Sequence, residues 1–116
     1  VVFIENYSGV LPVLKRNLSG LKSINNFEII EKNIYDDNTF SNIKEKFDVI
    51  FLDPPYRDND LYKTIITIKN QNLLKKNGII ILHRHKNEND FFPSNFKIIE
   101  EKKYGISKVL FITFIN

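Results

Sequence analysis

The chain has 116 residues, of which 42% are hydrophobic, so it can bury the core of one small domain. It contains no cysteine, which excludes disulfides and thiolate chemistry and fits a cytoplasmic location, and no apolar run reaches the roughly 20 residues that span a bilayer. A net charge of +3 weakly favours polyanionic partners and excludes no class of enzyme by itself.

The N-terminal part of the chain predicts a strand, a helix and a second strand. Val1–Ile4 form a β-branched and aromatic run, and Glu5 follows it directly. Leucines at helical spacing over 11–21 predict a helix, in which Pro12 is tolerated because it falls in the first turn. A second apolar run over Phe27–Glu31 completes this strand, helix, strand unit.

The middle of the chain is organised around the run Phe47–Leu52, which predicts a buried strand. Before it, polar turn residues over 36–39 predict the start of a short helix that runs to Ile43. After it, Asp53-Pro54-Pro55-Tyr56 ends the strand, because neither proline has a backbone N–H to pair. The remaining predicted elements are a helix over 61–68, a turn over 76–78, a buried strand over 79–82, and a closing antiparallel hairpin over 96–104 and 108–114.

Strands that alternate with helices and end in a hairpin predict an α/β protein with a doubly wound sheet. In such a sheet ligands bind at the carboxyl ends of the strands, which is where Asp53 and Tyr56 fall. Asp53 and the carbonyl of Pro54 are two acceptors for an amino group with two hydrogens, and the ring of Tyr56 can stack on a planar base. The same residues also fit a plain strand end with a proline turn, in which Asp53 caps the next helix. The residues alone leave both interpretations open.

The third buried strand ends at His83, and His85 lies two positions further along. Two histidines are candidate metal ligands, but the chain has no cysteine, and no carboxylate follows them before Glu88. We therefore expect no metal site and interpret the two histidines as a strand end or a basic patch near a nucleic acid.

Several of these features occur together in one known family, and the likeness covers essentially the whole chain. The chain resembles the RsmD-type ribosomal RNA methyltransferases in Glu5 after the first strand, Leu14-Lys15-Arg16-Asn17-Leu18 in the first helix, Asn33 after the second strand, Asp53-Pro54-Pro55-Tyr56, Gly78 before the third buried strand, and Tyr104-Gly105-Ile106-Ser107-Lys108-Val109-Leu110. Asp-Pro-Pro-Tyr alone is shared with adenine and cytosine amino-methyltransferases. Its combination with the terminal hairpin motif narrows the resemblance to the RsmD-type family.

The resemblance implies a Rossmann-like, class I S-adenosylmethionine-dependent methyltransferase fold. Residues 1–116 are then a single methyltransferase domain, the C-terminal part of the full family domain. The implied reaction moves a methyl group from S-adenosylmethionine to the exocyclic N2 of a guanine in small-subunit (16S) rRNA. The implied partner is ribosomal RNA or an assembly intermediate of the small subunit, with no membrane partner, and the full-length protein is expected to be a monomer.

The resemblance also assigns roles to individual residues. Glu5 matches the carboxylate that accepts hydrogen bonds from the ribose hydroxyls of the cofactor. Asn33 and Ile34 match the pair that borders the adenine, and Asp53 is also counted among the cofactor-contacting residues. The implied pocket for the target base consists of Asp53, Pro54, Pro55 and Tyr56. No metal and no covalent intermediate are implied.

Two features depart from the family pattern. A glycine-rich loop, with the strand before it and the helix after it, normally precedes the equivalent of Val1, and this sequence does not contain it. The chain is therefore expected to be N-terminally truncated and to lack the central strand of its sheet. Relatives often carry an acidic residue after the third buried strand, where this chain has His83.

Two other interpretations stay open. A DNA adenine-N6 methyltransferase shares the Asp-Pro-Pro-Tyr turn, but no segment here is long enough for the target-recognition insertion expected of that class. The other interpretation is an inactive, truncated remnant of a methyltransferase, because the loss of a central strand exposes sheet edges and apolar surface.

The 116-residue chain is expected to bind S-adenosylmethionine weakly or not at all, because the family's glycine-rich loop cradles the methionine end of the cofactor. Isothermal titration calorimetry of the cofactor into the chain measures this affinity directly. A dissociation constant in the micromolar range would contradict the prediction.

Overall fold

The computed structural model describes residues 1–21, 26–36, 38–54 and 60–115, and the chain divides into two compact units, Val1–Asn42 and Ile43–Asn116. The first unit contains a small parallel sheet, in which Ile4 lies opposite Ile30, so both strands end at the same edge. Its elements are the strand β1 (Val2–Ile4), the helix α1 (Leu11–Ser19) and the strand β2 (Glu28–Ile30).

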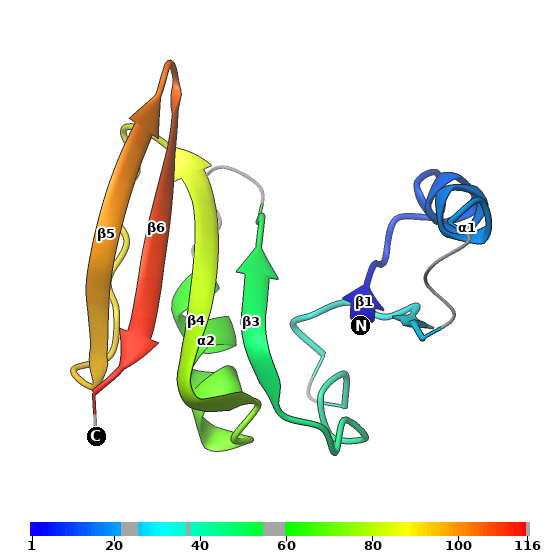
Figure 1. Ribbon diagram of the computed structural model, residues 1–116, viewed down its shortest axis with the longest axis horizontal. Coiled ribbons are helices and arrows are strands. Elements are labelled where there is room, and N and C mark those ends of the chain that lie inside the picture. The colour runs from blue at the N-terminus through cyan, green and yellow to red at the C-terminus, as the bar shows by residue number, and fades with distance from the viewer. Residues whose placement is uncertain (22–25, 37, 55–59, 116) are drawn as a thin grey trace. The chain divides into compact units, whose positions relative to one another are not determined.

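The second unit is a four-stranded mixed sheet with one helix on one of its faces (Figure 1). The strand order is β3-β4-β6-β5, in which β3 is parallel to β4 and the other neighbours are antiparallel. Its elements are β3 (Phe47–Leu52), α2 (Leu61–Asn70), β4 (Leu74–His85), β5 (Phe96–Tyr104) and β6 (Ser107–Phe114). No helix in the described part of the chain is long and apolar enough to cross a membrane.

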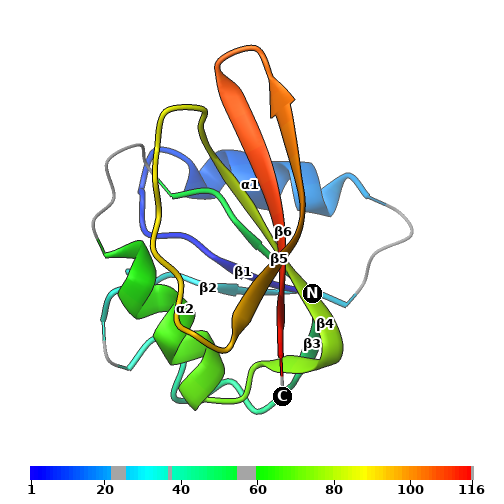
Figure 2. The same cartoon turned by 90° about the vertical axis from the view of Figure 1, so that its left-hand side faces the viewer.

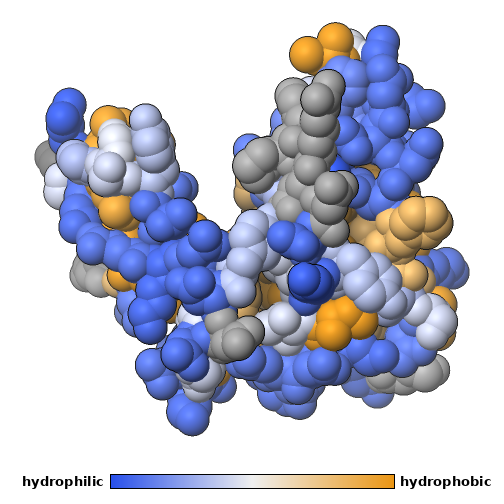
Figure 3. Space-filling view, turned by 180° about the vertical axis from the view of Figure 1, so that it is seen from behind, coloured by the Kyte–Doolittle hydropathy of each residue, from blue (hydrophilic) through white to orange (hydrophobic). Residues whose placement is uncertain are grey.

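The helix α2 covers one face of this sheet, and the core of the unit lies between them (Figure 2). Buried positions alternate along β4 and β6, because successive side chains of a strand point to opposite faces. Ile80, Leu82 and Ile112 on the strands and Ile65 on the helix have no exposed surface. The molecular surface on the side shown in Figure 3 is mostly hydrophilic, with small apolar areas.

The opposite face of the sheet is less covered. Val49 and Phe51 on β3 are 55% and 61% exposed. Ile50 and Leu52, which alternate with them along the strand, are half-buried. The prediction of a buried strand is therefore wrong for the face that carries Val49 and Phe51. The reason is that α2 lies on the other face of the sheet.

The predicted short helix before β3 is wrong, since residues 38–42 form turns (Asp37 lies outside the described residues). The carbonyl of Asn33 accepts hydrogen bonds from the N–H of Asp36 and the hydroxyl of Thr39. The N–H of Thr39 donates in turn to the carbonyl of Asp36 at 3.1 Å. Local side-chain and backbone hydrogen bonds of this kind compete with a helix for the same backbone groups.

The strand β4 begins earlier than predicted. Phe47 pairs with Leu74 and Val49 pairs with Ile79, so residues 75–78 form an irregular insertion within the strand where a separate turn is predicted. Gly78 is required there because a Cβ atom would lie 2.8 Å from the backbone oxygen of Lys75, which cannot move aside as a side chain can. Beyond this point the pairing of β3 with β4 is regular.

One buried ion pair joins β4 to the segment that follows it. The side chains of Arg84 and Asp90 are 1% and 9% exposed, and Nε and Nη2 of Arg84 donate to the two carboxylate oxygens at 2.9 and 3.0 Å. Glu88 places a carboxylate oxygen 3.6 Å from Nη2 of Arg84, and its carbonyl accepts a hydrogen bond from Nζ of Lys108. These contacts anchor the segment after β4 to the sheet.

We expect the substitution Asp90→Ala to lower the free energy of unfolding by about 3 kcal/mol, because it leaves a buried guanidinium without its main partner. The control is Asp48→Ala, since the side chain of Asp48 is 81% exposed and pairs with Lys75 at 3.3 Å. The control is expected to cost less than about 1 kcal/mol. Urea unfolding followed by circular dichroism compares the two variants, and equal losses would argue against a stabilising role for Asp90.

Candidate active site at the strand ends

Polar residues follow the apolar runs of β3 and β4 at one edge of the second unit's sheet. The two strands are parallel, and Leu52 lies opposite Leu82. Asp53 and His83 are the next residues along the two strands, so they come out side by side at the carboxyl end of β3. This is the edge at which α/β sheets bind ligands.

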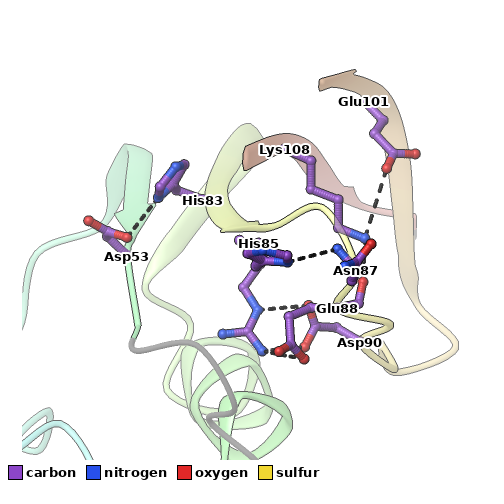
Figure 4. Close-up of polar contacts among 9 residues, drawn as sticks. Asp53, His83, His85, Asn87, Glu88, Asp90, Glu101 and Lys108 are labelled. Atoms are coloured by element: carbon purple, nitrogen blue, oxygen red, sulfur yellow. Dashed lines mark hydrogen bonds and ion pairs between the residues drawn. The ribbon is translucent and has the colours of Figure 1, made fainter. Parts of the chain in front are cut away.

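Asp53 and His83 form a direct contact (Figure 4). Oδ1 of Asp53 lies 2.9 Å from Nδ1 of His83, and the two side chains are 57% and 30% exposed. An ionised carboxylate can only accept hydrogen bonds. In this contact, Nδ1 of the imidazole therefore carries the proton and donates a hydrogen bond to Asp53. Among the described residues, the second oxygen of Asp53, Oδ2, has no hydrogen-bond partner. The pair is therefore held together and still open to a ligand.

Pro54 is buried directly after Asp53. Pro55 and Tyr56, the other two residues of the predicted base pocket, lie outside the residues that the structure describes. The stacking role of Tyr56 and the acceptor role of the Pro54 carbonyl therefore stay predictions.

His83 gains its partner from a strand 30 residues earlier in the chain, so the absence of a carboxylate before Glu88 does not leave it unpaired. The interpretation of His83 as a plain strand end is incomplete for this reason. The sequence holds one signal for this pair, because two apolar runs each end in a polar residue. If the two runs form neighbouring parallel strands, their polar residues meet at the same edge of the sheet. No group of three or more His, Cys, Asp or Glu side chains within the described ranges is placed to hold a metal ion.

Glu5 follows β1 in the first unit. Its N–H donates to the carbonyl of Ile30, which continues the pairing of β1 with β2. Its Oε1 accepts hydrogen bonds from the N–H groups of Asn6 and Tyr7 at 3.1 and 3.0 Å. These bonds hold the carboxylate in one orientation, and its Oε2 has no hydrogen-bond partner within the described part of the chain.

Asn33 and Ile34 follow β2 at the same edge of that small sheet. The side-chain oxygen of Asn33 accepts the N–H of Tyr35 at 2.9 Å, so the amide NH2 is the group left to meet a ligand. Ile34 is half-buried and offers an apolar side chain. A free carboxylate oxygen, an amide donor and an apolar side chain fit the hydroxyls and the base of a nucleoside cofactor. Asp53, the fourth predicted cofactor contact, belongs to the second unit.

Residues 1–113 match the family described as conserved hypothetical protein 95. Ribosomal RNA small subunit methyltransferase D of Haemophilus influenzae is 34% identical over 107 residues, which are 91% of this chain and 55% of that protein. The protein of the same name from Buchnera aphidicola subsp. Acyrthosiphon pisum is 33% identical over 90 residues, which are 77% of this chain and 46% of that protein. The chain thus spans about half the length of the curated relatives it matches.

Solved structures share the fold. The crystal structure of a candidate methylase from Haemophilus influenzae matches with a TM-score of 0.82 and 30% identity, over 100% of this chain and 73% of that one. A conserved hypothetical protein from Streptococcus pyogenes matches with a TM-score of 0.82 and 26% identity, over 96% of this chain and 69% of that one. The fold is the Rossmann-like fold of class I methyltransferases, so the predicted fold class is confirmed.

We expect Asp53→Ala and His83→Ala each to change the free energy of unfolding by less than about 1 kcal/mol, because the pair that they break is partly exposed. Urea unfolding of the two variants, beside Asp90→Ala, measures this. A loss as large as that of Asp90→Ala would assign the pair to the structure and not to a ligand.

Proposed function

The chain belongs to the conserved hypothetical protein 95 family, and from this premise we propose that it is a methyltransferase domain, over residues 1–116, that acts on ribosomal RNA of the small subunit. The two relatives named ribosomal RNA small subunit methyltransferase D support this proposal. They also bear out the resemblance that the motifs predict. The finer proposal is transfer of a methyl group from S-adenosylmethionine to the exocyclic N2 of a guanine.

The observation that carries the proposal is the carboxylate of Asp53 at the end of β3. One of its oxygens is held by His83, and the other has no hydrogen-bond partner among the described residues. The alternative role of Asp53 as a helix cap loses support, because α2 begins at Leu61 with Asp60 at its N-cap position. An accessible, oriented acceptor at a strand end is what an amino group of a nucleobase requires.

The chemical difficulty of the reaction is the low nucleophilicity of the amine, whose lone pair is delocalised into the ring of the base. When bound, S-adenosylmethionine supplies an electrophilic methyl group on a sulfonium centre. We propose that Oδ2 of Asp53 and the carbonyl of Pro54 accept hydrogen bonds from the two amine hydrogens. These bonds favour a pyramidal nitrogen whose lone pair points at the methyl carbon, so positioning and electrostatics supply most of the acceleration.

The target base must leave its stack to reach this site, at a cost of a few kcal/mol unless it is already unpaired. Stacking on the ring of Tyr56 is proposed to offset part of that cost, since base–aromatic stacking contributes about 1–3 kcal/mol. The proposed partner is ribosomal RNA or a small-subunit assembly intermediate. The net charge of +3 weakly favours such a polyanionic partner.

Glu5, Asn33 and Ile34 are the proposed cofactor contacts in the first unit. Oε2 of Glu5 is proposed to accept hydrogen bonds from the ribose hydroxyls, since the hydrogen bonds to Oε1 already fix the carboxylate. The amide of Asn33 and the side chain of Ile34 are proposed to border the adenine.

In the full-length protein, Asp53→Ala is expected to lower the rate of methyl transfer by about 100-fold or more, because it removes the oriented acceptor. Cofactor affinity is expected to stay within a few-fold, since Asp53 is assigned mainly to the base. The assay follows labelled methyl groups into small-subunit rRNA and, for comparison, into duplex DNA.

Asp48→Ala is the matched control, because Asp48 lies on β3, the strand that Asp53 follows, and its side chain is 81% exposed. Transfer to DNA and not to RNA would favour an adenine methyltransferase, and no transfer by the wild type would favour an inactive remnant. A loss of cofactor binding in Asp53→Ala would contradict the assignment of Asp53 to the base.

A further inference from the structure

We infer that Nε2 of His83 takes up the proton that the amine loses on methylation, and that Asp53 orients the imidazole for this task. The inference rests on the proposed function and names the residue that completes its proton balance. It gives each oxygen of Asp53 its own role, since Oδ1 contacts His83 and Oδ2, which has no hydrogen-bond partner within the described ranges, is assigned to the amine.

The geometry of the pair selects one form of the imidazole. Because Nδ1 donates to the carboxylate at 2.9 Å, the neutral ring has its other nitrogen, Nε2, unprotonated and able to accept. Nε2 makes no hydrogen bond to any described residue, and the side chain is 30% exposed. A carboxylate that holds Nδ1–H while Nε2 acts as the base is the arrangement that Ser-His-Asp enzymes use.

His85, two residues along the same strand, shows the opposite arrangement. Its Nδ1 lies 3.1 Å from the backbone N–H of Asn87 and accepts that hydrogen bond, so Nδ1 carries no proton in His85 (Figure 4). Arg84 between the two histidines is buried on the other face of the sheet and bound to Asp90. His83 thus has a carboxylate partner at Nδ1, and its Nε2 has no hydrogen-bond partner among the residues that the structure describes.

Methyl transfer to the amine conserves atoms and charge. The lone pair of the amine forms the new N–C bond, while the bond from that carbon to the sulfonium sulfur breaks and leaves its electron pair on sulfur. The methylated nitrogen then carries a positive charge and one proton more than the neutral product. Because both N–H groups of the amine are assigned to Oδ2 of Asp53 and the carbonyl of Pro54, the proton moves through solvent water to Nε2 of His83, and the resulting imidazolium is stabilised by the adjacent carboxylate of Asp53. Because the side chain is partly exposed, water can remove the proton afterwards.

The first test needs no enzymatic activity. In the full-length protein labelled with nitrogen-15 at histidine, two-bond proton–nitrogen correlation spectra report which ring nitrogen carries the proton. We expect the proton on Nδ1 in His83 and on Nε2 in His85, and we expect Asp53→Ala to shift His83 towards the Nε2–H form. A neutral His83 with its proton on Nε2 in the wild type would overturn the inference.

The second test measures kinetics in the full-length protein with labelled cofactor and small-subunit rRNA. His83→Gln keeps an N–H donor for Asp53 but has no base, so kcat is expected to fall by about 100-fold while KM changes little. Added imidazole is expected to restore part of the activity of His83→Ala, which it would not do for a purely structural residue. His85→Gln is the matched control and is expected to stay within about threefold of the wild type.

The outcomes separate this inference from the proposed function. If Asp53→Ala is inactive while His83→Gln stays within about tenfold of the wild type, the proton leaves by another route and the inference is wrong, although the proposed function stands. If the wild type transfers no methyl group to RNA, the proposed function fails and the inference fails with it.

Discussion

The parallel pairing of β3 with β4 places the candidate active site, because neighbouring strands in register end at one edge of the sheet about 4.8 Å apart. Leu52 opposite Leu82 brings the carboxylate of Asp53 to the imidazole of His83. A slip of one residue would turn one of the two side chains to the other face. The irregular stretch before Ile79 lies upstream of these residues, so the register at the site is regular.

The alternation of side chains along β4 then places a buried ion pair and the candidate active site on opposite faces of the sheet. Arg84 points to the face that α2 covers, where its bond to Asp90 is almost completely removed from water. His83 and His85 point to the other face and are only partly buried. One short stretch of strand therefore carries a buried ion pair that anchors the following segment and, next to it, a partly exposed pair at the sheet edge. In the first unit, Glu5 and Asn33 likewise follow two parallel strands.

Much of the secondary structure is predictable from apolar periodicity and from proline and glycine, because these signals act within a few residues. The two helices, the strands β1 to β3 and the closing hairpin all follow from such signals. The short helix predicted before β3 is absent because the carbonyl of Asn33 is used by turn hydrogen bonds. The exposure of Val49 and Phe51 also escapes prediction, since hydrophobicity does not say which face of a strand the rest of the fold covers.

For the site, the sequence by itself determined that Asp53 follows an apolar strand and that prolines end it, and its motifs were enough to indicate the family. These are local properties of the chain, set by backbone chemistry and residue order. The partnership of Asp53 with His83, the opposite hydrogen bonding of His85 and the burial of Arg84 were decided only by the tertiary structure. Each of these depends on the register between paired strands and on how the chain packs. Both bring together groups from different segments, so neither can be read from neighbours in sequence.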